Sequence, residues 1–229
     1  MTNKYMNCSR KAIIFDFDGT LADSGECGLL ATQKAFKECD LPIPTKKEID
    51  YYMGIPIEQS FHEMTNHTLN DEQFAKLLQL FRLSYKTLEE QTISAFPHLN
   101  EVLSTFHKKG LLLFVVSSKK TDVLHRNLQK LEMDRFFTDW IGSDQVEHYK
   151  PHPDGILKIV ERYSLKVTEC VMVGDAIFDI QMGKAAGCET VAVNWGSHSK
   201  EQLLKEKPSF FALEVRDLYN LTKLMSIDS

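Results

Sequence analysis

Two acidic residues separated by a single position follow a short apolar run near the start of the sequence. The run, residues 12–15, is followed by Asp16, Phe17, Asp18 and Gly19. Glycine allows a tight turn there, and the ligands of an open parallel sheet bind beyond the carboxyl ends of its strands. The pattern predicts that both carboxylates face a ligand, although Asp and Gly also end strands in ordinary turns.

A second pair of carboxylates follows another apolar run. Residues 171–173 lead into Gly174 and Asp175, and Asp179 lies in the first turn of the helix predicted next. Acidic residues at such positions often cap a helix N-terminus. Two carboxylates about 4 Å apart, however, repel by about 4 kcal/mol at an effective dielectric constant of about 20. An oxygen-only ligand set suits Mg²⁺, so we predict that Mg²⁺ neutralises the two acidic pairs.

Hydroxyl groups and a lysine occupy two further positions of interest. Ser117, Ser118 and Lys119 follow the apolar segment 111–116, which puts hydroxyls and backbone N–H groups at a third strand end. Lys150 stands just before a helix that a proline begins. The serines could simply cap a helix, and the lysine could be a solvated surface residue. Their occurrence together with the acidic pairs, in this order, favours a catalytic site.

These residues need a sheet to bring them together, and the sequence predicts one. Short apolar runs alternate with helical patterns, and the runs are apolar on both faces, as in parallel strands covered on both sides. Such alternation predicts an α/β fold with a doubly wound parallel sheet and right-handed crossovers. The expected strands are 12–15, 111–116, 170–173, 190–193 and, with a weaker pattern, 136–141. The expected helices are 98–109, 121–131, 153–163, 177–186 and 214–225.

The segment 22–92 interrupts this alternation. It holds no convincing strand, but helical spacing is present in 28–39, 57–64 and 71–90. Prolines and a glycine separate these helices, at Pro42, Pro44, Gly54 and Pro56. We therefore predict a catalytic core of residues 1–21 and 93–229, with residues 22–92 inserted after the first strand as a helical cap.

Composition narrows the possible functions. The 229 residues are 43% hydrophobic and 26% charged with a net charge of −5, which is typical of a folded soluble protein. Nucleic-acid binding is not expected, because it requires a basic surface, and the longest strongly apolar run is far too short to cross a membrane. Residues 1–11 lack the apolar region of a signal peptide, so a cytoplasmic location is expected. Five scattered cysteines without a C-x-x-C pair predict free thiols: Cys8, Cys27, Cys39, Cys170 and Cys188.

The order of these motifs resembles that of the haloacid dehalogenase (HAD) superfamily. The motifs are D-x-D-G-T-L, a serine at a strand end, K-P-x-P and G-D-x-x-x-D. The cap-length insertion between the first two is similar to that of the phosphoglycolate phosphatase-like branch. The resemblance covers nearly the whole chain, and it implies a Rossmann-like HAD core with an inserted α-helical cap.

The resemblance also implies a role for each acidic residue. Asp16 would attack phosphorus and become an aspartyl-phosphate. Asp18 would protonate the leaving oxygen and then accept a proton from the hydrolytic water. Mg²⁺ would be held by the side chains of Asp16 and Asp175 and by the backbone carbonyl of Asp18, while Asp179 would bind the waters of the metal.

The remaining motif residues would bind the phosphoryl group. Ser117, Ser118 and Lys150, with nearby backbone N–H groups, would neutralise the phosphoryl oxygens, and Lys150 would also offset the charge of Asp16. The implied activity is that of a phosphoric monoester hydrolase acting on a small phosphorylated metabolite. Phosphoglycolate, pyrophosphate, a nucleoside monophosphate and a sugar phosphate remain open as substrates, and so does the oligomeric state.

Other functions compete with this one. A phosphomutase or a pyrophosphatase of the same superfamily would share the catalytic residues. A dehalogenase is disfavoured, because Asp18 is present and that reaction has no leaving alkoxide to protonate. A receiver-like signalling domain would carry its acceptor aspartate on a middle strand and would lack the long insertion.

Four weaker candidates lie around the predicted site. His152 stands beside Lys150 and could touch the site, although a turn role is the favoured interpretation. The loop 54–56 resembles the cap loop that faces the active site in this branch. Arg82 and Tyr85 share one face of a predicted cap helix, so they either reach the leaving group or play solvated and core roles.

Overall fold

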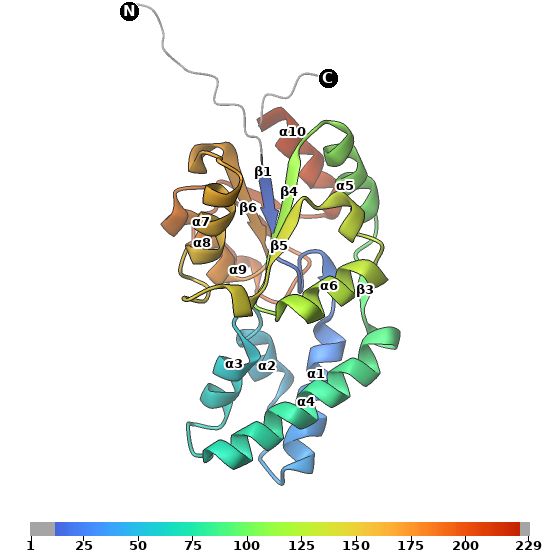
Figure 1. Cartoon of the computed structure of the whole chain (residues 1–229), viewed down its shortest axis with the longest axis vertical. Helices are drawn as coiled ribbons and strands as arrows, with labels where there is room; N and C mark the ends of the chain where they lie inside the picture. Colours follow the sequence, from blue (N-terminus) through green and yellow to red (C-terminus); the bar gives the residue numbers. More distant parts are fainter. Residues whose placement is uncertain (1–11, 225–229) are drawn as a thin grey trace, which may run out of the picture.

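A computed structural model describes residues 12–224, and its centre is a six-stranded parallel sheet (Figure 1). All five predicted strands are confirmed, the first with the predicted bounds and the weakest shortened to three residues. A sixth strand at the sheet edge was not predicted, because its three residues make too short a pattern. The strands, in sheet order, are β5 (Asp139–Ile141), β4 (Leu112–Val116), β1 (Ala12–Phe15), β6 (Cys170–Gly174), β7 (Glu189–Val193) and β8 (Phe210–Ala212).

The strand order places β1 in the interior of the sheet. From β1 the chain builds outward through β4 to β5, and it then returns to the other side of β1 to add β6, β7 and β8. The direction of winding therefore reverses next to β1. In doubly wound sheets the crevice at the carboxyl ends of the strands on either side of such a reversal is where ligands bind.

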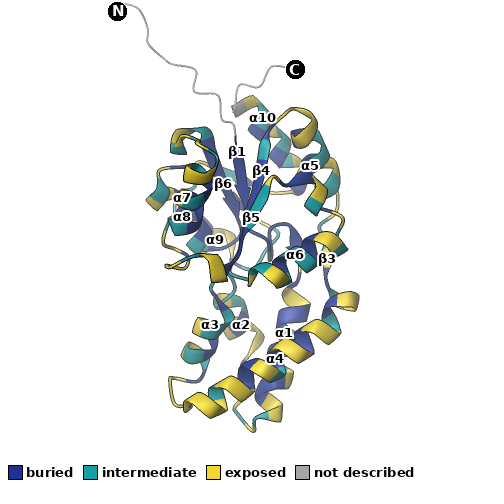
Figure 2. Ribbon diagram, viewed as in Figure 1, coloured by how far each residue is buried: buried dark blue, intermediate teal, exposed yellow. Residues whose placement is uncertain are grey.

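Helices cover both faces of the sheet, as the apolar strands require. Neighbouring residues of β1 point to opposite faces, so Ile13 and Ile14 belong to two different hydrophobic clusters. Leu103 of α5 packs into the first cluster and Ile156 of α7 into the second. Figure 2 shows the central strands buried between these layers. The main covering helices are α5 (Leu99–Lys108), α6 (Thr121–Lys130), α7 (Asp154–Arg162) and α8 (Ile177–Ala186).

The predicted helices differ from the structure in two places. The segment 214–225 is not one helix but a 3₁₀ turn, Val215–Tyr219, followed by α10 (Asn220–Leu224). Two six-residue helices were not predicted, α2 (Lys46–Tyr51) and α9 (Lys200–Lys205). They are too short to show helical periodicity, although each begins with a capping box that could have revealed it.

Four helices lie together beyond the carboxyl ends of the strands (Figure 1). They are α1 (Gly25–Glu38), α2, α3 (Ile57–Met64) and α4 (Asp71–Thr92). The expectation that 22–92 contains no strand is wrong, because β2 (Ala22–Asp23) pairs antiparallel with β3 (Ser94–Ala95). This two-residue ladder holds the start and the end of the segment side by side, and two residues are too few to give a strand pattern.

Two further observations bear on the expectations from composition. In the part of the chain from 12 to 224, none of the helices combines the length and the apolar character that crossing a bilayer requires. Cys27 and Cys39 are free thiols, as predicted. Cys8 and the rest of the segment 1–11, on which the signal-peptide expectation depends, lie outside the described residues.

Candidate active site

The turn after β1 presents the first acidic residues at the carboxyl end of the sheet. The backbone N–H of Asp16 continues the ladder by donating to the carbonyl of Val173 at 2.9 Å. Gly19 adopts a positive φ of 76°, which only glycine adopts without strain. A Cβ atom at Gly19 would lie 2.3 Å from a carboxylate oxygen of Asp175. Glycine is therefore needed both for the turn and for the close approach of Asp175.

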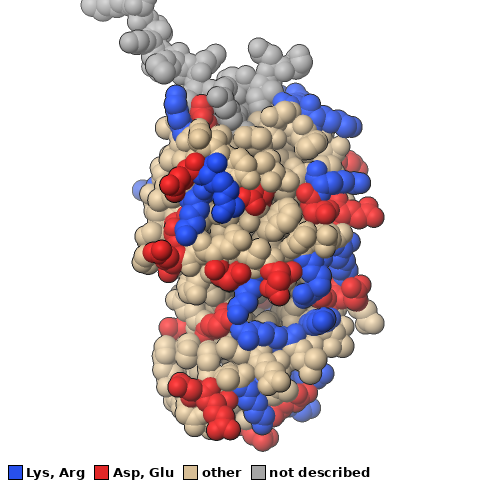
Figure 3. Space-filling model, viewed as in Figure 1, with Lys and Arg blue, Asp and Glu red and all other residues tan. Residues whose placement is uncertain are grey.

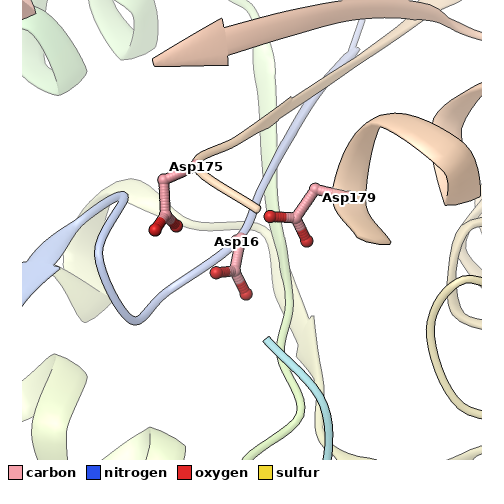
Figure 4. Close-up of side chains that lie close together, drawn as sticks. All are labelled: Asp16, Asp175 and Asp179. Carbon is pink, nitrogen blue, oxygen red and sulfur yellow. The ribbon is translucent and has the colours of Figure 1, made fainter. Parts of the chain in front are cut away.

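Three carboxylates meet at this edge of the sheet (Figure 4). Asp16 comes from the end of β1, Asp175 from the end of β6 and Asp179 from the first turn of α8. All three residues are buried, and each offers an oxygen that lies within 4.8 Å of the others. The doubly wound sheet thus brings together residues that are distant in sequence.

Lys150 supplies a positive charge inside this cluster. Its ammonium nitrogen lies 2.5 Å from Oδ1 of Asp16 and 2.8 Å from Oδ1 of Asp179, and the residue is buried. Burial alone would lower the pKa of Lys150, but the charges of Asp16 and Asp179 raise it above the ordinary value. Lys150 is therefore protonated at neutral pH, and it is not the solvated surface lysine considered from the sequence.

One lysine does not balance three buried carboxylates. Burial raises the pKa of Asp16 to about 7, even though Lys150 acts in the opposite direction. Burial and the charge of Asp16 raise the pKa of Asp175 to about 6. The pKa of Asp179 is also raised, mainly by burial. The cluster therefore lacks positive charge, and its oxygen-only donor set fits a hard divalent cation.

Two of the three carboxylates accept further hydrogen bonds besides those from Lys150. Asp175 accepts from the Thr20 hydroxyl at 2.9 Å and from the backbone N–H and hydroxyl of Ser197, each at 2.7 Å. Asp179 accepts from the backbone N–H of Ala176 at 3.0 Å as well as from Lys150. Sequence reasoning missed Thr20 and Ser197. Thr20 lies within the first motif, whereas no pattern marks Ser197.

Asp18 lies apart from this cluster. Its carboxylate accepts hydrogen bonds from the Ser24 hydroxyl and the Lys119 ammonium group, and it lines a cavity next to Asp16. The acidic cluster described here thus contains three carboxylates, not the four expected from the strand ends. Lys119 was visible in the sequence beside Ser118, but only the fold shows that it pairs with Asp18.

The two serines after β4 differ in their surroundings. The Ser117 hydroxyl is buried and accepts from the backbone N–H of Lys119 at 3.1 Å. The Ser118 hydroxyl donates to the carbonyl of Gly54 at 2.7 Å, and both of these residues line the cavity. The loop that contains Gly54 therefore reaches the third strand end, as its resemblance to a cap loop implied.

The cavity has a volume of about 480 Å³ and lies between the sheet edge and the helices α1–α4. Arg82 and Tyr85 of α4 both line it. Arg82 is also partly exposed and paired with Glu58, and Tyr85 belongs to the first hydrophobic cluster, so both interpretations of these residues stay open. Figure 3 shows basic and acidic side chains gathered on this face, between the sheet and these helices. His152 does not line this cavity; its ring accepts from the backbone N–H of Asp154 at 3.3 Å, which is a turn role.

Known proteins resemble this chain in sequence and in fold. The family model described as haloacid dehalogenase-like hydrolase matches residues 13–193. The phosphoglycolate phosphatase of Escherichia coli (strain K12) is 29% identical over 228 residues, which cover 91% of this chain and 90% of that protein. A protein of Caldanaerobacter subterraneus, provisionally named a pyrophosphatase, is 28% identical over 215 residues, covering 93% and 94%. The solved structure of a hydrolase from Pseudomonas syringae is 26% identical, with a TM-score of 0.83 and coverage of 96% and 100%.

These matches include the strand ends on which the site is built. The family model spans the segments that carry Asp16, Ser117, Lys150 and Asp175, and curated relatives named phosphoglycolate phosphatase cover most of the chain. The resemblance inferred from the motifs is confirmed, together with the Rossmann-like α/β fold. This chain belongs to the haloacid dehalogenase-like hydrolase family.

Proposed function

We propose that this protein is a Mg²⁺-dependent phosphatase that hydrolyses a small phosphorylated metabolite through an aspartyl-phosphate on Asp16. The observation that carries the proposal is the position of Asp16. Its carboxylate stands at the end of an interior strand, is held by Lys150 at 2.5 Å, and opens on a cavity large enough for a metabolite.

In the first step, a carboxylate oxygen of Asp16 attacks phosphorus and the bond from phosphorus to the leaving oxygen breaks. Lys150 helps to keep Asp16 ionised, because its charge and hydrogen bond oppose the effect of burial on the pKa of Asp16. Water then attacks the phosphorus of the aspartyl-phosphate, which releases inorganic phosphate and restores the carboxylate.

Asp18 is positioned to move the protons in both steps. It lines the cavity beside Asp16, where the leaving group has to sit. Protonated Asp18 would donate its proton to the leaving oxygen, and the resulting carboxylate would accept a proton from the hydrolytic water. The contacts with Ser24 and Lys119 fix the orientation of this carboxylate.

The acidic cluster would hold Mg²⁺. Its ligands would be the side chains of Asp16 and Asp175 and the backbone carbonyl of Asp18, while Asp179 would bind waters of the metal. When bound, the ion would neutralise charge on the phosphoryl oxygens and on the three carboxylates. The charge imbalance of the cluster supports this assignment.

Ser117, Ser118 and Lys150 would bind the phosphoryl oxygens. Ser118 has a single O–H donor, and that donor is bonded to the carbonyl of Gly54 in this structure. A contact between Ser118 and phosphate therefore requires the loop of Gly54 to release the hydroxyl. The backbone N–H groups of Ser117 and Lys119 also have partners in this structure, the carbonyl of Ile141 and the Ser117 hydroxyl.

Residues 22–92 would act as a cap that excludes water from the aspartyl-phosphate, with residues 1–21 and 93–229 as the core. The pairing of β2 with β3 close to both joins supports this division. Phosphoglycolate and pyrophosphate are the substrates that the relatives' names suggest. The two relatives are almost equally identical to this chain but are named for different substrates, so their names do not indicate which leaving group this protein releases. A cytoplasmic location remains a prediction.

The decisive experiment is to trap the covalent intermediate. The protein is mixed with Mg²⁺ and an activated aryl phosphate, quenched in acid, and digested for mass spectrometry. We expect phosphate on the peptide that contains Asp16, more of it in Asp18→Asn, and none in Asp16→Asn. Turnover without phosphate on Asp16 in either the wild type or Asp18→Asn would refute the proposed mechanism.

A further inference from the structure

The cavity beside Asp16 is larger than a two-carbon leaving group needs. Its volume is about 480 Å³, whereas a cavity of about 150 Å³ already holds benzene. The helices α1–α4 are in contact with the sheet edge in this structure: Ser118 donates to Gly54 at 2.7 Å, and His198 Nε2 lies 3.3 Å from the carbonyl oxygen of Tyr51. The cavity therefore has this volume even though the segment of α1–α4 and the sheet edge are in contact.

Apolar and aromatic side chains form much of the wall above Asp16. They come from the loop between α2 and α3, from α4 and from α6, and they include Tyr52, Met53, Ile55, Phe81 and Val123. Covering apolar surface of this kind stabilises a complex by about 25 cal/mol per Å². The wall is thus suited to the apolar faces of a ring.

Four of the five basic residues that line the cavity already have carboxylate partners. Arg82 Nη2, for example, lies 2.6 Å from Glu58 Oε1. A leaving group with its own negative charge would compete with these carboxylates for the four paired residues. Lys86 has no ion pair among residues 12–224, but its side chain is exposed to solvent. The pairs are Lys119 with Asp18, Arg82 and Lys120 with Glu58, and Arg126 with Glu89.

One polar group of the wall is buried without a partner. The Tyr85 hydroxyl oxygen has no hydrogen bond within the described part of the chain, although the residue is only 8% exposed and lines the cavity. Cys27 lies near it, but a thiol is a weak partner. The oxygen has almost no accessible surface, so a ligand in the cavity would bond to it only if the Tyr85 side chain turned toward the cavity. Such a bond would offset the cost of an unsatisfied buried hydroxyl.

Gly28 in α1 leaves part of this space open. A Cβ atom there would meet only Met53 Sδ, at 3.8 Å, which is an ordinary van der Waals contact. A larger side chain at position 28 would therefore extend into the cavity without a clash at its first atom. Gly25, on the same helix, is exposed, and a Cβ atom added to it would have nothing within 4 Å, so it offers a matched control outside the cavity.

We propose that the substrate is a phosphomonoester of a bulky, uncharged, ring-bearing alcohol of nucleoside type, that Gly28 provides the room for the ring, and that the Tyr85 hydroxyl bonds to a polar atom of it. This proposal rests on the phosphatase activity proposed for the same site. It disfavours phosphoglycolate and pyrophosphate, because both have small leaving groups that carry negative charge.

The test compares kcat/KM for nucleoside 5′-monophosphates of each base with that for phosphoglycolate and pyrophosphate, all with Mg²⁺. We expect the best nucleotide to exceed both by at least about tenfold, the scale of discrimination that pocket contacts provide. Gly28→Leu should lower kcat/KM for that nucleotide by at least about tenfold and that for phosphoglycolate by less than about threefold. Gly25→Leu should change neither.

Tyr85→Phe provides a second measurement that does not depend on filling the cavity. It should lower kcat/KM for the best nucleotide by about fivefold, the effect of one hydrogen bond, and leave phosphoglycolate unchanged. The proposal is overturned if phosphoglycolate or pyrophosphate is the better substrate, or if Gly28→Leu affects nucleotide and phosphoglycolate equally. An activated aryl phosphate separates the two proposals: if it too is not hydrolysed, the phosphatase activity itself is refuted.

Discussion

The ammonium nitrogen of Lys150 lies 2.5 Å from a carboxylate oxygen of Asp16, and both side chains are buried. The same nitrogen lies 2.8 Å from Asp179, so one cation bridges two of the three carboxylates. A buried pair of this kind contributes less than Coulomb's law suggests, because both charges lose their hydration. Losing Lys150 leaves buried carboxylates without a cation, whereas losing Asp16 leaves Lys150 paired with Asp179, so the two losses have unequal consequences.

Lys150→Met should lower the free energy of unfolding by about 3–5 kcal/mol, because three buried carboxylates then face one another without a cation. Phosphatase activity should be lost as well. Lys108→Met, on the surface, should remain within about 0.5 kcal/mol of wild type. Urea unfolding of the metal-free proteins at pH 8 gives these values. Equal stability of the two variants would contradict the role assigned to Lys150.

Asp16→Asn should abolish turnover but should not destabilise the fold. The pKa of Asp16 is raised to about 7 in the folded protein, which means that folding disfavours its charged form at pH 8. Replacing the carboxylate with a neutral amide removes that penalty, while Lys150 keeps Asp179 as its partner. We expect a melting temperature equal to or above that of the metal-free wild type. Phosphate release near the wild-type rate would exclude Asp16 as the nucleophile.

Asp18→Asn should separate substrates by their leaving groups. An aryl phosphate hardly needs a proton on its leaving oxygen, whereas an alkyl phosphate does. In a single-turnover assay, formation of the aspartyl-phosphate should slow by about 10²–10⁴-fold for an alkyl phosphate and far less for an activated aryl phosphate. Asp23→Asn, at an exposed position nearby, is the control. The acid role fails if both substrates slow by the same factor.

Mg²⁺ should be required for turnover and should stabilise the fold. Exhaustive chelation should remove activity, and adding Mg²⁺ at about 100 times its Kd should stabilise the protein by about 2.7 kcal/mol. Asp175→Asn should lose most of both effects, since Asp175 is one of the three clustered carboxylates. Ca²⁺ should inhibit, because its looser coordination displaces the nucleophile. Full activity after chelation would contradict the proposed requirement for Mg²⁺.

Glu89 of α4 should stabilise the contact between α4 and α6, and this stabilisation should depend on pH. Burial alone would raise the pKa of Glu89, but hydrogen bonds from Arg126 at 2.7 Å and from Asn127 at 3.1 Å lower it. Glu89→Gln should therefore cost about 1–2 kcal/mol at pH 7, after allowance for the exposure of Arg126. Glu90→Gln, on the exposed face, should cost less than about 0.5 kcal/mol.

The sign of the pH dependence follows from the lowered pKa of Glu89. Its stabilising effect is complete above the ordinary value of 4.5 and is lost as the pH falls through the lower folded value. The stability difference between wild type and Glu89→Gln should thus shrink below about pH 4.5, as unfolding in urea at several pH values would show. A difference that stays constant down to about pH 3 would contradict this account.

Local pattern was enough to predict most of the core. The runs at 12–15 and 170–173 are apolar on both faces and end in acidic residues, and the structure contains them as β1 and β6 with nearly the same bounds. Short elements were not predicted, because β8 has three residues and α2 has six, which are too few to show a repeating strand or helix pattern. The ladder of β2 with β3 depends on pairing across the whole inserted segment, which no local window contains.

The sequence by itself determined the fold family and the strand ends, and it singled out Asp16, Asp18 and Asp175 as candidate site residues. It could do so because the spacing of motifs and the sequence of strands and helices along the chain are local properties. Only the tertiary structure decided the partners of these groups. Lys119 turned out to bind Asp18, and Ser197 to bind Asp175 across 22 positions. Such contacts depend on how strands and loops are placed in three dimensions, and the volume of the cavity depends on the same placement. For this reason the reaction could be inferred from motifs, whereas the shape available to the substrate could not.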